Sequence, residues 1–282
     1  MSDYVFVADV FVEQVLGGGE LSNEELINIL SSRGHKVQKV LSNQVSVSFL
    51  EENRDKNFII GNFIFLSEAS KRFFEQNSDV KYVIYEHDHK YLRNRNPSEY
   101  DNYKAPPSHI VNYNFYKNAA AVLCQTSFHK AIAQTNLNLE NIKSVGGNLW
   151  SLDILNYLSE LSLVEKNDKV AIMDSPINHK NTYGAVKYCE YNNLSYELIP
   201  KLPYREFLKR MSQNKKLAFF PKTPETCSRI LVESRMMNMG VLTNDKCGAK
   251  YEEWFRLKGQ DMINKVMDMR EDITNIVEAC YE

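Results

Sequence analysis

Short apolar runs alternate with amphipathic stretches along the first half of the chain. Such alternation is typical of a parallel sheet that is covered by helices on both faces. Strand character is found at residues 4–8, 37–40, 45–49, 58–65, 82–85 and 119–124. Helical periodicity is found at residues 22–32, 68–76 and 127–135. The first half therefore predicts an α/β domain of the Rossmann type.

The alternation restarts near Lys169, after a stretch without a clear pattern. Further strands are expected at residues 170–173, 195–199, 217–220 and 241–243. Further helices are expected at residues 182–192, 204–212 and 228–239, and the last thirty residues also have helical spacing. We therefore predict two Rossmann-like domains, residues 1–155 and residues 156–282. The last helix is a candidate for packing back on the first domain.

The composition is that of an ordinary globular protein. Of the 282 residues, 43% are hydrophobic and 25% are charged, and the formal net charge is −2. A run of about 18 apolar residues, as a membrane-spanning helix needs, does not occur, and we find no pattern of a secretory signal. The five cysteines match neither a zinc site nor a redox pair. We therefore expect a cytoplasmic protein with reduced thiols, no membrane span and no bound metal.

The charge is unevenly distributed along the chain. Residues 201–250 carry a balance of +7, so that the remaining residues carry −9. A local positive field suits a phosphorylated ligand or a polyanion, although a solvated basic face would have the same composition.

The strongest local pattern lies between a strand and a helix in the second half. The strand ends at Pro221, the loop carries Glu225, and the helix starts near Ser228. Ligands of open parallel sheets bind at the carboxyl ends of strands, and N–H groups at a helix start, here around Ser228 and Arg229, suit a pyrophosphate. Glu233, further along this helix, could accept hydrogen bonds from both hydroxyls of a ribose. The pattern indicates a nucleotide site.

This segment resembles the donor-binding segment of retaining glycosyltransferases of the GT-B fold, family 4 in particular. That family has a glutamate, seven residues, a second glutamate, a small residue and an apolar helix, followed by a glycine and a strand. The matching positions here are Glu225, Glu233, Ser234, Gly240 and the strand Val241-Leu242-Thr243 with Asn244. Three further matches follow the family's order: Gly17-Gly18-Gly19-Glu20, Arg33-Gly34-His35-Lys36-Val37 and Lys180.

The resemblance implies a fold and an activity. The fold would be α/β, with two Rossmann-like domains whose parallel sheets face each other across a cleft. The enzyme would move a sugar from a nucleotide-sugar to an acceptor hydroxyl with retention and without a cofactor, a UDP-sugar being favoured over a GDP-sugar.

The resemblance also implies the roles of single residues. On the donor side, Lys180 and the helix start at Ser228 and Arg229 would hold the phosphates, and Glu233 would hold the ribose. Glu225 would bind the hydroxyls of the donor sugar as a catalytic residue. The family has an arginine where this chain has Ser175, so that one phosphate-binding charge is missing, and Arg229, Lys222 and Lys246 are candidates to replace it.

The resemblance also implies roles for two segments of the first half of the chain. Gly17 and Gly18 would let the N-terminal loop approach the donor, unless the glycines only make a flexible turn. His87, which follows the strand at 82–85, would be a catalytic residue close to the donor sugar and the acceptor.

The region after this strand is polar and aromatic. Glu86-His87-Asp88-His89 resembles a set of metal ligands, but neighbours on an extended chain point to opposite faces, and we therefore favour a polar edge without metal. The following residues, 90–117, interleave tyrosines with lysines and arginines. They predict an acceptor site in which Asp88, Tyr91, Arg93 and Arg95 take part. The alternative is that the aromatic rings only anchor this segment to the first domain.

The acceptor itself remains open. The segment 86–89 and the turn Gly146-Gly147-Asn148-Leu149-Trp150 resemble the short glycosyltransferases encoded by T4-like phages, some of which add sugar to hydroxymethylated cytosine in DNA. In that case double-stranded DNA is a partner, and the target base would be flipped out. A saccharide, lipid-linked sugar or protein acceptor, a nucleotide-sugar epimerase and a non-catalytic nucleotide-binding module are the alternatives.

Overall fold

The computed structural model describes residues 2–282, which form two compact units. The first unit comprises the described residues up to Trp150 together with Met269–Glu282. The second unit comprises Ser151–Asp268. No helix among residues 2–282 is both long and apolar enough to cross a membrane.

The first unit is built on a six-stranded sheet in the order β2-β1-β3-β4-β5-β6, in which all neighbours are parallel. Its central strands are apolar on both faces, because helices cover both faces of the sheet. The strands are β1 (Asp3–Ala8), β2 (Lys36–Leu41), β3 (Asn57–Ile60), β4 (Tyr82–Glu86), β5 (Ala121–Cys124) and β6 (Ile142–Ser144).

Successive side chains of a strand point to opposite faces of the sheet and contact the helices that cover each face. Val5 and Val7 point into a core that includes residues of α2, α3, α4 and α5. Phe6 points to the other face, where Phe6 and Asn23 of α1 both lie beside Gly61. The helices are α1 (Gly18–Ser32), α2 (Val47–Glu52), α3 (Glu68–Gln76), α4 (Tyr113–Asn118), α5 (Ser127–Leu137) and the part of α10 (Gly259–Glu278) from Met269 onward.

The C-terminal segment is bound to the turn between α1 and β2. Arg33 forms ion pairs with Glu271 and Glu278, and His35 Nε2 lies 2.7 Å from a carboxylate oxygen of Glu278. The hydroxyl of buried Tyr281 donates to the main-chain carbonyl of Phe58 in β3. The turn Arg33–Val37 thus anchors residues 269–282 to the first unit.

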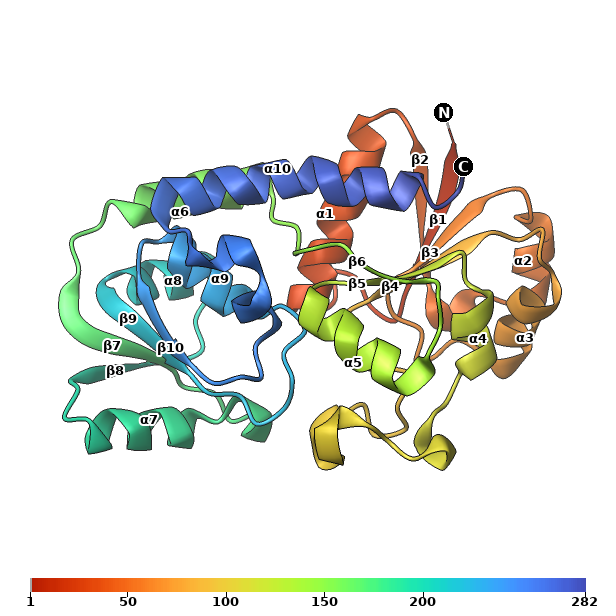
Figure 1. The fold of residues 1–282 in the computed structure, drawn as a ribbon. Helices are drawn as coiled ribbons and strands as arrows, with labels where there is room; N and C mark the ends of the chain where they lie inside the picture. The colour runs from red at the N-terminus through yellow and green to blue at the C-terminus, as the bar shows by residue number, and fades with distance from the viewer. Residues whose placement is uncertain (1) are drawn as a thin grey trace. The chain divides into compact units, whose positions relative to one another are not determined.

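The second unit has a four-stranded parallel sheet in the order β10-β9-β7-β8. Helix α7 packs on one face of this sheet through Ala185 and Cys189, and α6, α8 and α9 pack against one another on the other face (Figure 1). The strands are β7 (Asn167–Met173), β8 (Tyr196–Ile199), β9 (Asn214–Phe219) and β10 (Gly240–Thr243). The helices are α6 (Leu152–Ser162), α7 (Thr182–Tyr191), α8 (Tyr204–Ser212), α9 (Arg229–Met236) and residues 259–268 of α10.

Most predicted elements are confirmed, but several differ. Residues 45–49 were expected to form a strand, whereas Ser46 caps a helix by accepting a hydrogen bond from the Phe49 N–H at 3.1 Å. The strand expected to reach residue 65 ends at Ile60, because the Asp9 carboxylate binds the N–H groups of the loop that follows. Helix α1 begins at Gly18 rather than at residue 22, and β6, α4 and α6 were not predicted.

Candidate functional site

Three loops at the carboxyl ends of neighbouring strands are joined by hydrogen bonds in the second unit. The side-chain amide of Asn181, at the start of α7, donates to the Phe220 carbonyl at 2.8 Å. The amide of Asn244, after β10, donates to the Pro221 carbonyl at 2.8 Å. These bonds hold the loop after β9, which carries Glu225, between the loops after β7 and β10.

Glu225 is fixed through both its main chain and its side chain. Its N–H donates to the Lys246 carbonyl and its own carbonyl accepts from Gly248, each at 2.8 Å. Its carboxylate lies 2.8 Å from the ammonium of Lys180, with side-chain exposures of 17% and 26%. Lys180 ends the short helix η5 (Asn178–Lys180) after β7. The structure therefore brings together two residues that were predicted from separate motifs.

The start of α9 carries an unusual backbone and an unpaired hydroxyl. Ser228 precedes the helix with φ 72° and ψ 82°, in the left-handed region that is costly for a residue with a Cβ. Its Oγ is buried and has no hydrogen-bond partner in the described structure. A buried unpaired hydroxyl is unfavourable by about 1–3 kcal/mol, which a ligand that accepts its hydrogen bond would recover.

Glu233 is almost completely buried, with 3% of its surface exposed. Its carboxylate accepts a hydrogen bond from the Tyr204 hydroxyl at 2.6 Å and lies 3.4 Å from the Arg229 side chain. Burial and the charge of Glu233 raise the pKa of Tyr204 far above its ordinary value. A ribose at this position would therefore share the carboxylate with Tyr204, a residue that the sequence analysis did not single out.

The loop that carries Ser175 is closed by a hydrogen bond to the Thr182 hydroxyl. The Ser175 N–H donates to Thr182 Oγ1 at 3.0 Å. The ammonium of Lys222 reaches the same loop and donates to Asn178 Oδ1 at 2.7 Å. The ammonium of Lys246 donates to the Lys222 carbonyl at 2.6 Å. Two of the three candidate cations thus lie at the carboxyl edge of the sheet, whereas Arg229 is paired with a buried carboxylate.

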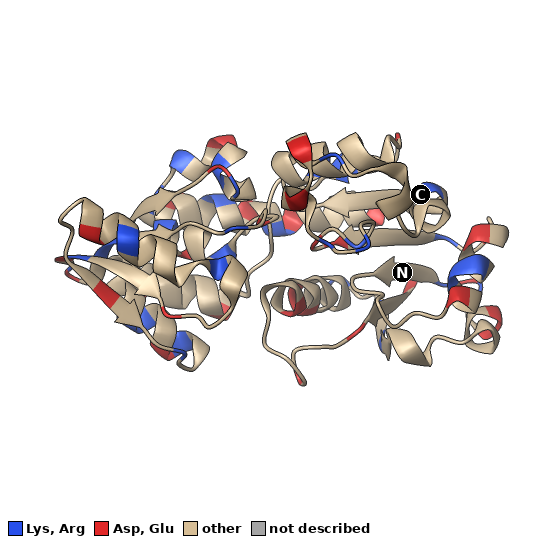
Figure 2. Ribbon diagram, turned by 90° about the horizontal axis from the view of Figure 1, so that it is seen from below, with Lys and Arg blue, Asp and Glu red and all other residues tan. Residues whose placement is uncertain are grey.

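The positive balance of residues 201–250 is partly neutralised inside the second unit. Arg205 pairs with Asp153, Arg210 with Glu197 and Lys215 with Asp168. Basic and acidic positions accordingly alternate along the ribbon (Figure 2). The positive balance of residues 201–250 therefore does not by itself indicate one continuous basic surface.

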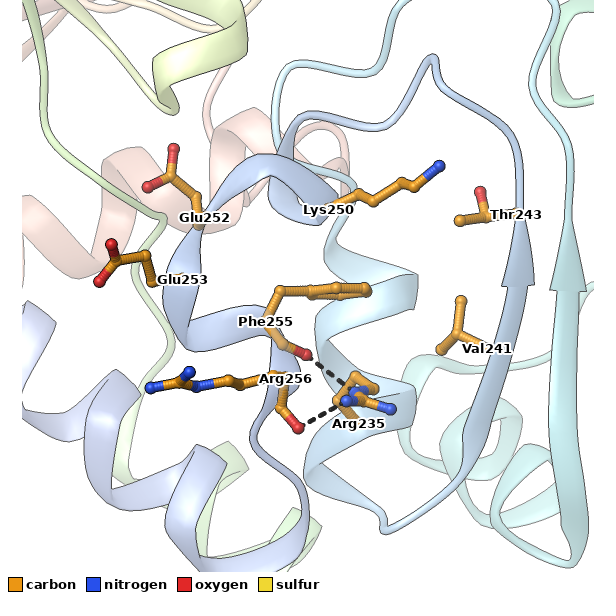
Figure 3. Close-up of a pocket in the computed structure, with 8 residues that line it drawn as sticks. All are labelled: Arg235, Val241, Thr243, Lys250, Glu252, Glu253, Phe255 and Arg256. Atoms are coloured by element: carbon orange, nitrogen blue, oxygen red, sulfur yellow. Dashed lines mark hydrogen bonds between the residues drawn. The ribbon is translucent and has the colours of Figure 1, made fainter.

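A pocket of about 350 Å³ lies elsewhere in the second unit, between α9, β10 and residues 248–256 (Figure 3). The Arg235 guanidinium donates to the carbonyls of Phe255 and Arg256, at 3.0 and 2.7 Å, and lies over the Phe255 ring. The lining residues are Arg235, Val241, Thr243, Lys250, Glu252, Glu253, Phe255 and Arg256, none of which was predicted to be functional.

In the first unit, His87 follows β4 and lies between two buried amides. Gln125 Nε2 donates to His87 Nδ1 at 2.7 Å, and His87 Nε2 lies 2.5 Å from Asn23 Oδ1. The exposed fractions of Asn23 and Gln125 are 1% and 3%. Both ring nitrogens are thus bound to the protein itself, an arrangement that the sequence analysis, which singled out His87 alone, did not foresee.

The neighbouring acidic residues share one buried lysine. Lys90 is fully buried and contacts the carboxylates of Glu86 and Asp88, the latter at 2.9 Å. Tyr116 donates its hydroxyl to Glu86. Burial raises the pKa of Glu86 to about 7 against the attraction of Lys90. Burial also acts on Asp88, but the Lys90 ammonium outweighs it and lowers the pKa of Asp88.

The predicted acceptor residues fall into two groups. Tyr91 is fully buried in the core of the first unit, and its hydroxyl lies 2.8 Å from His89 Nδ1. Its assignment as an acceptor contact was therefore wrong, because the ring is needed for packing. Arg93 and Arg95 are exposed, and Arg95 lies 3.6 Å from the half-exposed carboxylate of Asp88.

The glycine segment lies at the start of α1 rather than in a loop. Gly17 is the extended residue before the helix, and Gly18 is the first helical residue. A Cβ on Gly17 would collide with the Glu20 carboxylate. A Cβ on Gly19 would lie 3.3 Å from His87 Cγ. The Glu20 carboxylate ends a flexible side chain that can move aside, and the contact at Gly19 is only slightly tight. The role of Gly17 and Gly18 toward a donor stays a prediction.

Comparison with known proteins identifies the fold. No protein-family model and no curated protein matches the sequence. Solved structures do match over nearly the whole chain. Anabaena Alr3699/HepE in complex with UDP-glucose has a TM-score of 0.58 and 12% identity, covering 100% of this chain and 96% of that one.

Two further structures are similar over the same length. The catalytic domain of starch synthase IV from Arabidopsis thaliana, bound to ADP and acarbose, has a TM-score of 0.61 and 8% identity, with coverage of 97% and 95%. An α-glucosyltransferase in complex with UDP and a 13-mer DNA has a TM-score of 0.54 and 11% identity, with coverage of 97% and 90%. The chain, an α/β protein with two parallel sheets, thus has the fold of GT-B glycosyltransferases.

Proposed function

We propose that this protein transfers a sugar from a nucleotide-sugar, with UDP-sugar favoured, to an acceptor hydroxyl with retention of configuration. The observation that carries this proposal is the edge of the second sheet, where Lys180, Glu225 and the unpaired hydroxyl of Ser228 come from adjacent loops. The similarity to structures that hold UDP-glucose, UDP or ADP supports the same donor class.

The charges at this edge suit a diphosphate leaving group. Lys180 and the N–H groups at the start of α9, with Ser228 and Arg229, would hold the phosphates as negative charge develops on them. Glu225, now paired with Lys180, would bind hydroxyls of the donor sugar once the phosphates attract the ammonium. Glu233 would hold the ribose. From the first unit, Gly17 and Gly18 would approach the donor, and His87 would lie beside the sugar.

We further propose hydroxymethylated cytosine in double-stranded DNA as the acceptor, with Asp88, Arg93 and Arg95 on the acceptor side. The two arginines are exposed, and arginine is a common phosphate contact in DNA complexes. One similar structure holds a 13-mer DNA. A transfer assay with hydroxymethylated and unmodified duplexes tests this proposal, and equal sugar incorporation into both would contradict it.

A thermal-shift screen with UDP, GDP, ADP and their sugars tests the donor class. We expect UDP at about 100 times its Kd to stabilise the protein by about 2.7 kcal/mol, a rise in Tm of roughly 5 °C or more. The Glu233→Ala variant should lose this rise, because it lacks the carboxylate for the ribose.

The matched control for this screen is Tyr204→Phe. It removes the hydrogen bond to Glu233 but keeps the carboxylate. We expect the UDP-induced rise in Tm to persist in this variant. If no nucleotide stabilises the wild type, the transferase proposal fails and a non-catalytic role without nucleotide gains support.

We also propose that Lys222 supplies the phosphate charge that Ser175 lacks. Its ammonium already contacts Asn178, two residues before Lys180. Lys222→Ala should weaken UDP binding by about threefold to tenfold, and adding Ser175→Arg to that variant should restore it. Isothermal titration calorimetry measures both effects. An unchanged Kd in Lys222→Ala, or a loss only in Lys246→Ala, would contradict this assignment.

A further inference from the structure

Three segments of the first unit surround the His87 ring and its partner Asn23. Asn23 and Gly19 come from α1, Gly61 follows β3, and Gln125 follows β5. A Cβ on Gly19 would lie 3.3 Å from His87 Cγ, and a Cβ on Gly61 would lie 2.8 Å from Asn23 Nδ2. Gly19 thus leaves room for the ring itself, and Gly61 leaves room for Asn23.

The two amides determine where the imidazole carries its proton. A side-chain amide nitrogen only donates, so Gln125 Nε2 at 2.7 Å requires an unprotonated His87 Nδ1. An amide oxygen only accepts, so Asn23 Oδ1 at 2.5 Å requires a proton on His87 Nε2. The contacts thus specify the neutral Nε2–H tautomer. A proton on Nδ1 would place two donors against each other.

We propose that Asn23 and Gln125 are positioning residues of the transfer site, which hold His87 as a neutral Nε2–H imidazole. This inference rests on the proposed function. With both nitrogens bound inside the protein, His87 shapes the site as a fixed ring and exchanges no proton with the acceptor. The sequence had suggested a catalytic role for His87, and the contacts assign it a positional one.

Two charge-matched variants separate position from charge. Gln125→Glu replaces the donor at Nδ1 by an acceptor and therefore draws a proton to Nδ1. Asn23→Asp keeps an acceptor at Nε2 and therefore keeps the proton on Nε2. Each variant adds one negative charge beside the same ring, but only Gln125→Glu adds a proton to Nδ1.

The first readout is the ¹⁵N signal pair of the His87 ring, assigned by comparison with His87→Asn. In the wild type and in Asn23→Asp, we expect an unprotonated Nδ1 and a protonated Nε2. In Gln125→Glu, we expect a protonated Nδ1. A protonated Nδ1 in the wild type would overturn the inference, whether or not any variant is active.

The second readout is steady-state kinetics with the donor identified in the thermal-shift screen. For Gln125→Glu we expect kcat to fall by about 10-fold to 100-fold while KM for the donor changes by less than about threefold, because the ring loses its neutral form while the donor-binding residues are unchanged. Asn23→Asp is compared through its nitrogen signals only, because Asn23 is itself a positioning residue of this site. An unchanged kcat in Gln125→Glu would overturn the positioning role.

Failure of the proposed function gives a different result. If the wild type turns over no nucleotide-sugar, the transfer proposal is wrong and with it any role in transfer. The nitrogen signals would still show whether Asn23 and Gln125 fix the tautomer. If Gln125→Glu does not fold, as judged by its circular dichroism, Gln125→Ala takes its place, and the same fall in kcat is expected.

Discussion

Replacing Lys90 by methionine is expected to lower the free energy of unfolding by about 3–5 kcal/mol, because it leaves a buried carboxylate without its counter-charge. Lys90 and Glu86 are both fully buried and paired, and Tyr116 holds the second oxygen of Glu86. Methionine retains the length and apolar volume of the lysine stem. Urea denaturation followed by circular dichroism measures the loss.

The double variant Glu86→Gln with Lys90→Met is the control, because it removes both fully buried charges and leaves only Asp88, which is half exposed. We expect it to recover most of the stability that the single variant loses. A loss equal to that of the single variant would mean that packing, and not the unpaired charge, determines the effect.

The loss in Lys90→Met should also depend on pH. Burial raises the pKa of Glu86 to about 7 from its ordinary 4.5, so a proton on Glu86 favours the folded protein. This contribution is full below 4.5 and is lost as the pH rises through about 7. Without the attraction of Lys90, the pKa rises further. The variant should therefore be less destabilised at about pH 5 than at about pH 8.

Replacing Lys180 by alanine is expected to lower the turnover of the nucleotide-sugar by about 100-fold or more. Lys180 is the cation that contacts Glu225 at the carboxyl edge of the second sheet. Its loss removes charge stabilisation from the leaving phosphate and leaves the Glu225 carboxylate to repel it. Release of the nucleotide, followed by chromatography, measures turnover.

Lys187→Ala is the matched control. Lys187 lies on α7 of the same unit, is exposed and pairs with Glu190. The variant loses the same charge and should keep turnover within about twofold, because an exposed pair contributes little. Equal losses of turnover in both variants would indicate that the summed positive charge of the second unit, and not Lys180 itself, stabilises the leaving phosphate. A loss below about threefold in Lys180→Ala would contradict the proposed role of Lys180.

Local sequence was sufficient for elements with a clear period and a capping residue. Helix α3 begins and ends where its periodicity predicts, because Ser67 caps it by accepting from the Ser70 N–H at 3.0 Å. Strand β4 was predicted from its apolar run, since a central parallel strand is buried on both faces.

Local sequence failed where two periods compete or where an element is very short. The alternation Val45-Ser46-Val47-Ser48-Phe49 has the period of a strand, yet Ser46 caps a helix, so the tertiary position of Leu50 in the core decides. Strand β6 has only three residues, too few for a pattern, and it forms because β5 offers a free edge.

For the candidate site too, the sequence suggested single residues, whereas their contacts became visible only in the fold. The strand, loop and helix pattern pointed to Glu225, and the resemblance to glycosyltransferases pointed to Lys180 and His87 as candidate site residues. The pairing of Lys180 with Glu225 required β7 and β9 to be neighbours, and the contact of His87 with Gln125 required β4 and β5 to be neighbours. The sequence also could not show that Tyr91 is buried, because a polar aromatic segment is compatible with both a binding surface and an anchor.

By itself, then, the sequence determined the α/β alternation, since this depends on neighbours along the chain, and it supplied the candidate site residues. The tertiary structure decided which residues meet, as Lys180 meets Glu225 and His87 meets Asn23 and Gln125. It also decided that Lys90 compensates Glu86 inside the core. Those outcomes depend on strand order and burial, which arise only when segments distant in sequence pack together.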